Sequence, residues 1–166
     1  MRILIIRHGI AERAEPDAKG QEDALRELTR PGRQKLHKGI RGLRQIVPAI
    51  DLIATSPLAR ASQTAEIVSA AYDGARVVQI AALAPRKPPA QLVEWLNAHP
   101  NDATVALVGH EPHLSTFLCW LVTGLQESFV VLKKGGIAMI ETDSPVTAGR
   151  GKLLWLLKPS QTRRIR

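Results

Sequence analysis

The chain has 166 residues, 45% of them hydrophobic and 23% charged, which fits one globular domain and excludes a largely disordered protein. Its single cysteine, Cys119, excludes an internal disulfide, and no array of Cys and His predicts zinc or another metal site. The 23 Lys and Arg against 15 Asp and Glu give a net charge of +8, which favours an anionic partner: nucleic acid, an acidic protein, a phosphorylated ligand or a membrane surface.

The first expected element is a strand over residues 3–6, which is apolar on both faces. Such a strand is typical of the centre of a parallel sheet that is covered on both sides. Residues 10–28 are polar and charged, and we interpret them as a long loop with room for a short helix; loops of this length are often functional lids. No apolar run reaches the roughly 18 residues of a bilayer span, so we expect a soluble, cytoplasmic protein without membrane binding.

Two helices are expected to begin with a capping residue followed by a proline. Thr29 is the predicted N-cap of a helix over residues 29–47, with Pro31 in its first turn. Ser56, which also precedes a proline, is the predicted N-cap of a helix over residues 56–72. The remaining expected elements are strands over residues 52–54, 77–80, 104–108, 136–142 and 152–158, and helices over residues 90–98 and 114–122.

Strands alternate with helices through the first two-thirds of the chain, and two strands follow. This order predicts the α/β class, as a single three-layer αβα domain with a mostly parallel central sheet of about six strands. The last two strands have a short connection, so we expect them to be antiparallel to each other. We place the domain at residues 1–160 and expect the basic C-terminal tail, residues 161–166, to be frayed.

Three segments share one layout, in which an apolar strand is followed by a basic or imidazole side chain. The side chains in question are Arg7, His8, Arg60 and His110. Because ligands bind beyond the carboxyl ends of the strands in open α/β sheets, these side chains converge if the three strands are neighbours. Two guanidinium groups match phosphate oxygens, and a histidine beside them can attack phosphorus and carry the phosphoryl group. The pattern therefore predicts a phosphate site.

These segments also resemble a known family. Arg7-His8-Gly9 after an N-terminal strand resembles the RHG signature of the histidine phosphatase superfamily. Residues 55–65 look like the second arginine motif of that family, and residues 109–112 look like its second histidine motif. Within the superfamily, the short chain and residues 26–29 and 134–138 are most similar to the SixA-type phosphohistidine phosphatases.

The resemblance implies a phosphoglycerate mutase-like fold, phosphatase activity without a cofactor, and a monomer. It implies that His8 is the nucleophile and becomes phosphohistidine. It also implies that Arg7, Arg60 and His110 bind the phosphoryl group, and that Gly9 lets the chain turn close to the ligand.

One departure from the wider superfamily bears on the substrate. Mutases and many phosphatases of this class carry a glutamate after the third strand as proton donor, whereas residues 81–88 contain no carboxylate here. An alkoxide leaving group benefits greatly from a general acid, whereas imidazole leaves a phosphoramidate readily. The missing acid therefore favours phosphohistidine on a protein, such as an acidic phosphotransfer domain. Glu111 is the alternative acid, although an acid at a helix start is usually a capping or dipole residue.

Two other functions stay open: a phosphatase of small phosphate esters or polyphosphate, and a phosphoprotein- or nucleic-acid-binding module without turnover. Arg26 is either a substrate-binding residue from the loop or a surface arginine. The basic residues around the first long helix fit a solvated face, the docking of an acidic phosphoprotein, or nucleic-acid binding. No aromatic residues interleave with these charges, which disfavours nucleic acid. They are Arg26, Arg30, Arg33, Lys35, Lys38, Arg41 and Arg44.

Overall fold

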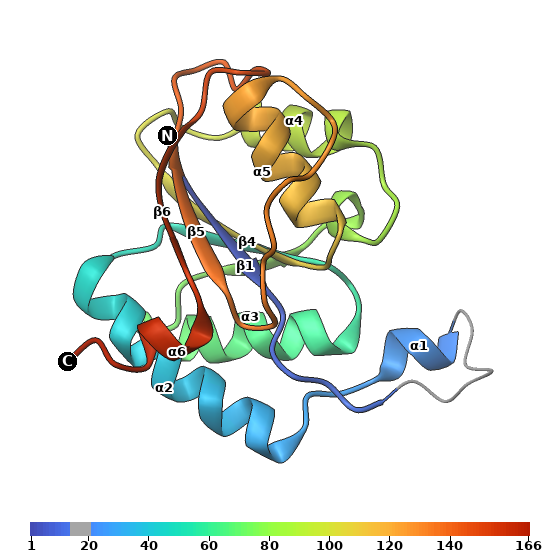
Figure 1. The fold of residues 1–166 in the computed structure, drawn as a ribbon, viewed down its shortest axis with the longest axis vertical. Helices are drawn as coiled ribbons and strands as arrows, with labels where there is room; N and C mark the ends of the chain where they lie inside the picture. The colour runs from blue at the N-terminus through green and yellow to red at the C-terminus, as the bar shows by residue number, and fades with distance from the viewer. Residues whose placement is uncertain (14–20) are drawn as a thin grey trace.

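A six-stranded sheet is the middle layer of the computed structural model, which describes residues 1–13 and 21–166. The strands lie in the order β3-β2-β4-β1-β5-β6 (Figure 1). β1 pairs in parallel with β4, and β2 pairs in parallel with β3 and β4, whereas β5 is antiparallel to both β1 and β6. The expected mostly parallel sheet is confirmed, as is the antiparallel final pair. In chain order the strands are β1 (Arg2–Arg7), β2 (Leu52–Thr55), β3 (Val77–Gln79), β4 (Thr104–Gly109), β5 (Ile137–Glu141) and β6 (Lys152–Leu157).

Helices cover both faces of the sheet (Figure 1). One layer holds α2 (Arg30–Ile46) and α3 (Ala59–Ala71), and the opposite layer holds α4 (Pro89–Asn97) and α5 (His113–Thr123). The shorter helical elements are α1 (Gln21–Leu25), the single turn η1 (Ala81–Leu83) and α6 (Pro159–Thr162). No helix in the described part of the chain is both long and apolar enough to cross a membrane.

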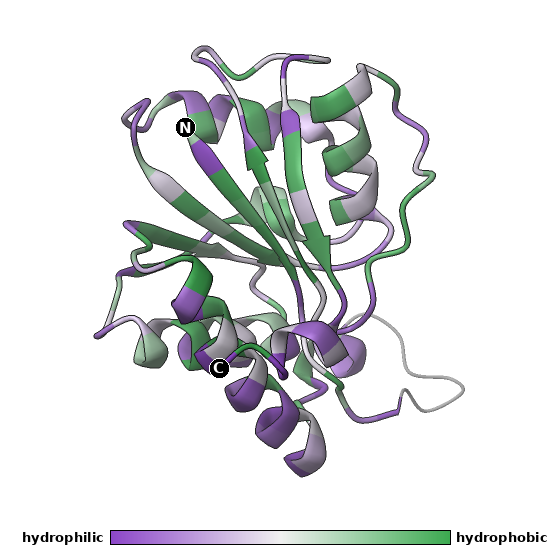
Figure 2. Ribbon diagram, turned by 60° about the vertical axis from the view of Figure 1, so that its left-hand side comes forward, coloured by the Kyte–Doolittle hydropathy of each residue, from purple (hydrophilic) through white to green (hydrophobic). Residues whose placement is uncertain are grey.

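The strand over residues 3–6 is buried on both faces, as its sequence predicts. Ile3 and Ile5 pack in the core beneath α4 and α5, whereas Leu4 and Ile6 pack beneath α2 and α3, and all four side chains are fully buried. Figure 2 shows that the strands of the sheet are mostly hydrophobic. β1 is therefore a rigid central strand, and the residues that follow it are fixed in position.

The two predicted helix caps have different outcomes. The Thr29 Oγ1 accepts a hydrogen bond from the Gly32 N–H at 3.0 Å, which confirms the N-cap of α2. The prediction for Ser56 is wrong, because α3 begins at Ala59 and its N-cap, Leu58, makes no capping bond with its side chain. The Ser56 hydroxyl instead pairs with a histidine ring of the candidate site described below.

The C-terminal helix α6 packs against α2. The expected boundary between domain and tail falls inside α6, whose Thr162 is buried against α2. A side chain at Gly42 of α2 would overlap the carbonyl oxygen of Thr162, so glycine is needed for this close approach.

In the predicted loop over residues 10–28, Ala11 forms an isolated antiparallel bridge with Leu28, and α1 is the expected short helix. The middle of that loop, residues 14–20, lies outside the described residues.

Candidate active site

The three motif-bearing strands are neighbours, in the order β2-β4-β1, and their carboxyl ends lie side by side. Arg7 is in register with Gly109, and Thr55 with Val108. A pocket of about 680 Å³ opens beyond these ends. The structure thus brings the residues of the three motifs together, as the sequence led us to expect. The four predicted side chains, Arg7, His8, Arg60 and His110, all line the pocket.

The ring of His8 is held in one tautomer. Its Nδ1 lies 2.7 Å from the carbonyl oxygen of Gly9, and because a carbonyl only accepts, Nδ1 must be the protonated nitrogen. Nε2 then carries the lone pair. Burial lowers the pKa of His8 to about 4, and the positive charges of Arg60, Arg7 and Lys134 act in the same direction. At neutral pH the ring is therefore a neutral imidazole with a free lone pair, the form that a nucleophile needs.

Backbone hydrogen bonds fix His8 from two sides. Its N–H donates to the Gly109 carbonyl at 3.0 Å, and its carbonyl accepts from the Gly135 N–H at 3.0 Å. Gly135 has a φ of +75°, a conformation that favours glycine. Gly9, predicted to turn close to the ligand, is outside the set of residues that line the pocket. Its carbonyl instead fixes the ring of His8, and its N–H donates to Thr64 Oγ1 at 3.1 Å.

His110 is the second buried imidazole, with its ring centroid 5.1 Å from that of His8. Its Nε2 is paired with the Ser56 hydroxyl at 2.8 Å, while its buried Nδ1 has no partner within the described residues. Burial lowers the pKa of His110 to about 3, and the charges of His8 and Arg60 add to the shift. Ser56 is a site residue that the sequence analysis missed, since a serine before a proline has the signature of a helix cap.

Both arginines line the pocket, and each has one buried nitrogen without a partner among the described residues. Arg7 Nη1 donates to the Leu132 carbonyl at 2.7 Å, and the Nη atoms of Arg60 donate to the carbonyl oxygen and the Oδ2 of Asp23 at 2.7 and 3.0 Å. In both arginines the buried Nε lacks an acceptor in the part of the chain described. Burial lowers the pKa of both guanidinium groups, which nevertheless stay charged at neutral pH. Two charged guanidinium groups that line one pocket are suited to bind an oxyanion there.

Asp23 is a second residue that the sequence analysis missed. Its carboxylate accepts from Nε and Nη2 of Arg26 at 2.8 and 2.6 Å as well as from Arg60. Burial opposes the ionisation of Asp23, but these hydrogen bonds outweigh it and lower the pKa. Asp23 therefore binds both Nη atoms of Arg60 and leaves Nε unpaired within the described residues. Arg26, a candidate for substrate binding, lines the pocket but is engaged with Asp23 and with the Glu12 carbonyl at 2.9 Å.

Glu111, the alternative proton donor, caps the following helix. Its Oε1 accepts a hydrogen bond from the backbone N–H of Ser115 in the first turn of α5 at 3.1 Å. This is the contact of a capping residue, although Glu111 also lines the pocket. The described residues contain no group of three or more His, Cys, Asp or Glu arranged to hold a metal ion.

Further cationic side chains complete the rim of the pocket. Arg86 and Lys87 come from the loop before α4, and Lys134 comes from the loop before β5. His113 also lines the pocket, and burial lowers its pKa. Lys134 belongs to a segment that carries the SixA resemblance, so the sequence held a signal for it. The arrangement is suited to bind a dianionic group, with a neutral imidazole beside it.

Comparisons with known proteins give a family match and a related sequence. The family model described as histidine phosphatase superfamily (branch 1) matches residues 3–87. An uncharacterized protein of Picosynechococcus sp. (strain ATCC 27264 / PCC 7002 / PR-6) is 38% identical over 140 residues, which cover 82% of each chain.

Solved structures share the fold. The protein histidine phosphatase SixA complexed with tungstate is 26% identical, with a TM-score of 0.81 over 96% of this chain and 98% of that chain. A phosphoglycerate mutase from Plasmodium falciparum is 18% identical, with a TM-score of 0.66 over 93% of this chain and 88% of the mutase. At that identity the mutase shows the fold alone, and it confirms the expected phosphoglycerate mutase-like architecture.

Proposed function

Because this chain belongs to the histidine phosphatase superfamily, we propose that it removes the phosphoryl group from phosphohistidine on a protein, such as an acidic phosphotransfer domain. Membership of the superfamily and the similarity to the protein histidine phosphatase SixA support phosphatase activity. The proposal that the substrate is phosphohistidine depends on whether the pocket contains a carboxyl group that is free to act as an acid. Among the described lining residues these are Asp23, bound by two arginines, and Glu111, bound to the backbone of α5.

A pocket without a free carboxylic acid is poorly suited to expel an alkoxide but adequate to expel imidazole. In the proposed first step, Nε2 of His8 attacks phosphorus while Arg7, Arg60 and His110 hold the phosphoryl oxygens. As the bond from Nε2 of His8 to phosphorus forms, the bond from phosphorus to the substrate nitrogen breaks, and the substrate imidazole leaves with that electron pair. Water then attacks the phosphorus on His8, and the bond from phosphorus to Nε2 breaks with its electron pair returning to the ring. The proton that the water loses leaves with the phosphate.

The alternative substrates are small phosphate esters and polyphosphate. The cationic rim of Arg86, Lys87 and Lys134 favours a ligand with more than one phosphate group, so polyphosphate is the stronger of the two. A binding module without turnover is the alternative from another class. It predicts affinity for phosphoproteins but no release of phosphate.

Parallel hydrolysis of a phosphohistidine peptide, a phosphoserine peptide and tripolyphosphate tests the proposed substrate. We expect kcat/KM on phosphohistidine to exceed that on phosphoserine by about a hundredfold or more, since a general acid contributes about 10²–10⁴-fold to ester cleavage. Equal rates on phosphoserine would contradict the argument from the missing acid. Faster turnover of tripolyphosphate would favour the alternative substrate, and no turnover of any substrate would favour the binding module.

The variant Glu111→Gln separates a capping role from an acid role. Glutamine keeps an oxygen that accepts from the Ser115 N–H but cannot donate the proton of a carboxylic acid. We expect kcat on the phosphohistidine peptide to change by less than about threefold, because a lost general acid would cost about 10²-fold or more. Glu111→Ala, which removes the cap as well, serves as the stability control, with an expected loss of about 1 kcal/mol in the free energy of unfolding. A hundredfold loss in the glutamine variant would make Glu111 the acid.

The lowered histidine pKa values predict an unusual pH profile. We expect kcat/KM to persist as the pH falls from about 7 toward about 5, because His8, with a pKa of about 4, keeps its lone pair over this range. The stability of the fold, unlike kcat/KM, should change over this pH range. Between the folded pKa of about 4 and the unfolded value of about 6.5, the unfolded chain binds more protons, so the free energy of unfolding falls as the pH falls.

The profile is measured with spontaneous hydrolysis subtracted and with the titration of the substrate followed by ³¹P NMR. Chemical denaturation across the same pH range measures the stability. An acid limb of kcat/KM near the ordinary histidine pKa of about 6.5, after correction for the substrate, would contradict the neutral, buried nucleophile.

A further inference from the structure

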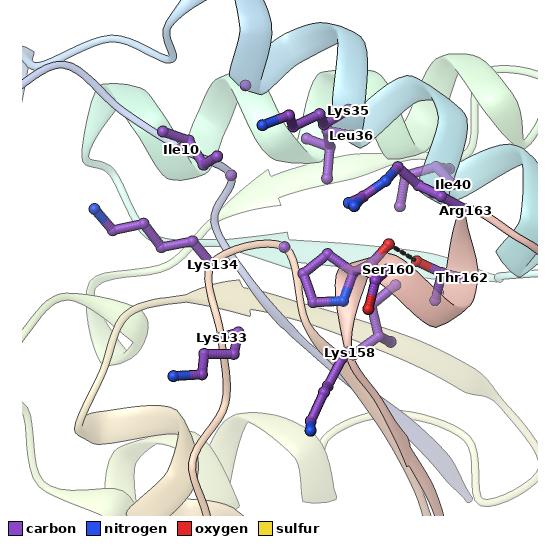
Figure 3. Close-up of a pocket in the computed structure, with 16 residues that line it drawn as sticks. Ile10, Lys35, Leu36, Ile40, Lys133, Lys134, Lys158, Ser160, Thr162 and Arg163 are labelled. Carbon is purple, nitrogen blue, oxygen red and sulfur yellow. Dashed lines mark hydrogen bonds between the residues drawn. The ribbon is translucent and has the colours of Figure 1, made fainter.

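A second cavity, of about 290 Å³, lies beside the candidate active site between α2, α6 and the loop before β5 (Figure 3). We call it the basic groove, and its five cationic side chains come from three separate segments of the chain. None of the five forms an ion pair with another described residue, and no carboxylate lies among the described lining residues. The five are Lys35, Lys133, Lys134, Lys158 and Arg163.

The basic groove combines charged and apolar lining residues. Its apolar lining residues include Leu36 and Ile40 of α2, Ile137 of β5 and Pro159 of α6, and the cationic side chains lie on different sides of the pocket (Figure 3). Unpaired cations around a concave surface attract anions, and the apolar lining favours contact with aliphatic side chains. No aromatic side chain is present among the described lining residues to stack on a base, which disfavours nucleic acid.

The basic groove is continuous with the candidate active site. Lys134 lines both cavities, and its charge acts on the ring of His8. Gly135 lines the groove, and its N–H donates to the carbonyl of His8. The residues that follow the nucleophile, Gly9 and Ile10, form part of the groove wall. A chain that lies in the groove therefore reaches the phosphate pocket past Lys134.

We propose that the basic groove docks an acidic segment with aliphatic side chains, which belongs to the phosphorylated protein substrate. The acidic residues pair with the lysines, and the aliphatic side chains rest on Leu36, Ile40 and Pro159. Docking brings the phosphohistidine of the substrate to the phosphate pocket. This inference rests on the proposed function and adds to it where the protein substrate is recognised.

Two peptides and two double variants test the groove. One phosphohistidine peptide carries a flank of aspartate, glutamate and leucine, and the other has glutamine in place of the acids. Lys133→Glu with Lys158→Glu reverses two groove charges and leaves Lys134 of the phosphate pocket intact. The matched control, Lys38→Glu with Arg41→Glu, makes the same charge change on exposed residues of α2 that line a different hollow, beside α3.

We expect wild-type kcat/KM to be about tenfold higher on the acidic peptide than on the neutral one, mainly through KM, since complementary charges act on association. The groove variant should bring this ratio close to one, and the control should retain it. Fluorescence anisotropy with the unphosphorylated acidic peptide should show binding to wild type and control that the groove variant loses.

Contrary outcomes separate the groove from the chemistry. If wild type hydrolyses both peptides equally, or if the control loses the ratio as fully as the groove variant, the docking proposal is overturned and the proposed function stands. If inhibition by tripolyphosphate, and not peptide preference, depends on the groove, the occupant is an inorganic anion and the proposal also falls. If wild type hydrolyses neither peptide but still binds the acidic one through the groove lysines, the proposed function fails alone.

Discussion

Replacing His8 by alanine is expected to lower kcat on a phosphohistidine peptide by at least about 10⁴-fold, as the loss of a covalent nucleophile does in other hydrolases. The ring is buried, its Nδ1 proton is fixed on the Gly9 carbonyl, and its Nε2 lone pair is free. The two other imidazoles that line the pocket differ from it, because Nε2 of His110 is paired with Ser56 and neither ring nitrogen of His113 has a partner among the described residues that would fix its tautomer. Substrate binding should survive, since both arginines remain.

The measurement is phosphate release under saturating peptide, with far-ultraviolet circular dichroism to confirm that the variant folds. His37→Ala is the matched control, because His37 is an exposed histidine of α2 outside the pocket. We expect this control to have wild-type kcat. A folded His8→Ala variant with turnover near that of wild type would rule out the covalent mechanism.

Replacing Arg60 by alanine is expected to lower kcat/KM by about 10³-fold, the scale of a guanidinium that stabilises a phosphoryl-transfer transition state. Two effects add in this variant. The pocket loses a buried donor, and Asp23 keeps only Arg26 as a partner, so its negative charge faces the incoming phosphoryl group less fully neutralised. Arg60→Lys should recover little, because an ammonium cannot bind Asp23 and a phosphate edge together as the planar guanidinium does.

Steady-state kinetics on the phosphohistidine peptide measures this loss. Arg44→Ala is the control, because Arg44 also pairs with an aspartate, Asp73, but outside the pocket. That change should leave kcat/KM within about twofold of wild type, since an exposed ion pair outside the pocket contributes little, and only to stability. If the Arg60 variants keep activity within about tenfold of wild type, Arg60 is not the phosphate ligand that we infer.

The fold was largely predictable because each strand or helix start can be recognised from a few neighbouring residues. The run Ile3–Ile6 is apolar on both faces, and this indicates a central strand without knowledge of its neighbours. Each of the three motifs follows such a strand, so the general rule for α/β sheets was enough to place them together. Thr29 before Pro31 was sufficient to locate the start of α2.

The parts of the site that escaped prediction depend on contacts between distant residues. Ser56 pairs with a ring 54 positions away, and Asp23 binds an arginine 37 positions away. A local pattern carries no information on such pairs, and in the case of Ser56 the local pattern pointed to a different role. Asp23 was also unexpected on chemical grounds, because a carboxylate in a phosphate pocket is favourable only when cations surround it.

The basic groove was not predictable for a similar reason. Many cationic residues of the chain lie on α2, the first long helix, but only Lys35 of that helix lines the groove with its charge. The other cations come from the loop before β5 and from residues around α6. The packing of α6 depends on Gly42, which lets the backbone of Thr162 approach α2. The net charge of +8 can be counted from the sequence, but only the folded structure shows which of the cationic side chains gather in one groove.

The central claim is that His8 carries the phosphoryl group during turnover. The most direct measurement mixes the protein with a phosphohistidine peptide, quenches the reaction in alkali within the first turnover, and locates the phosphoryl group by mass spectrometry of the digest. We expect phosphorylation of His8 in wild type and none in His8→Ala. Turnover without any phosphorylated histidine, or a label on His110 or His113 with His8 unmodified, would contradict it.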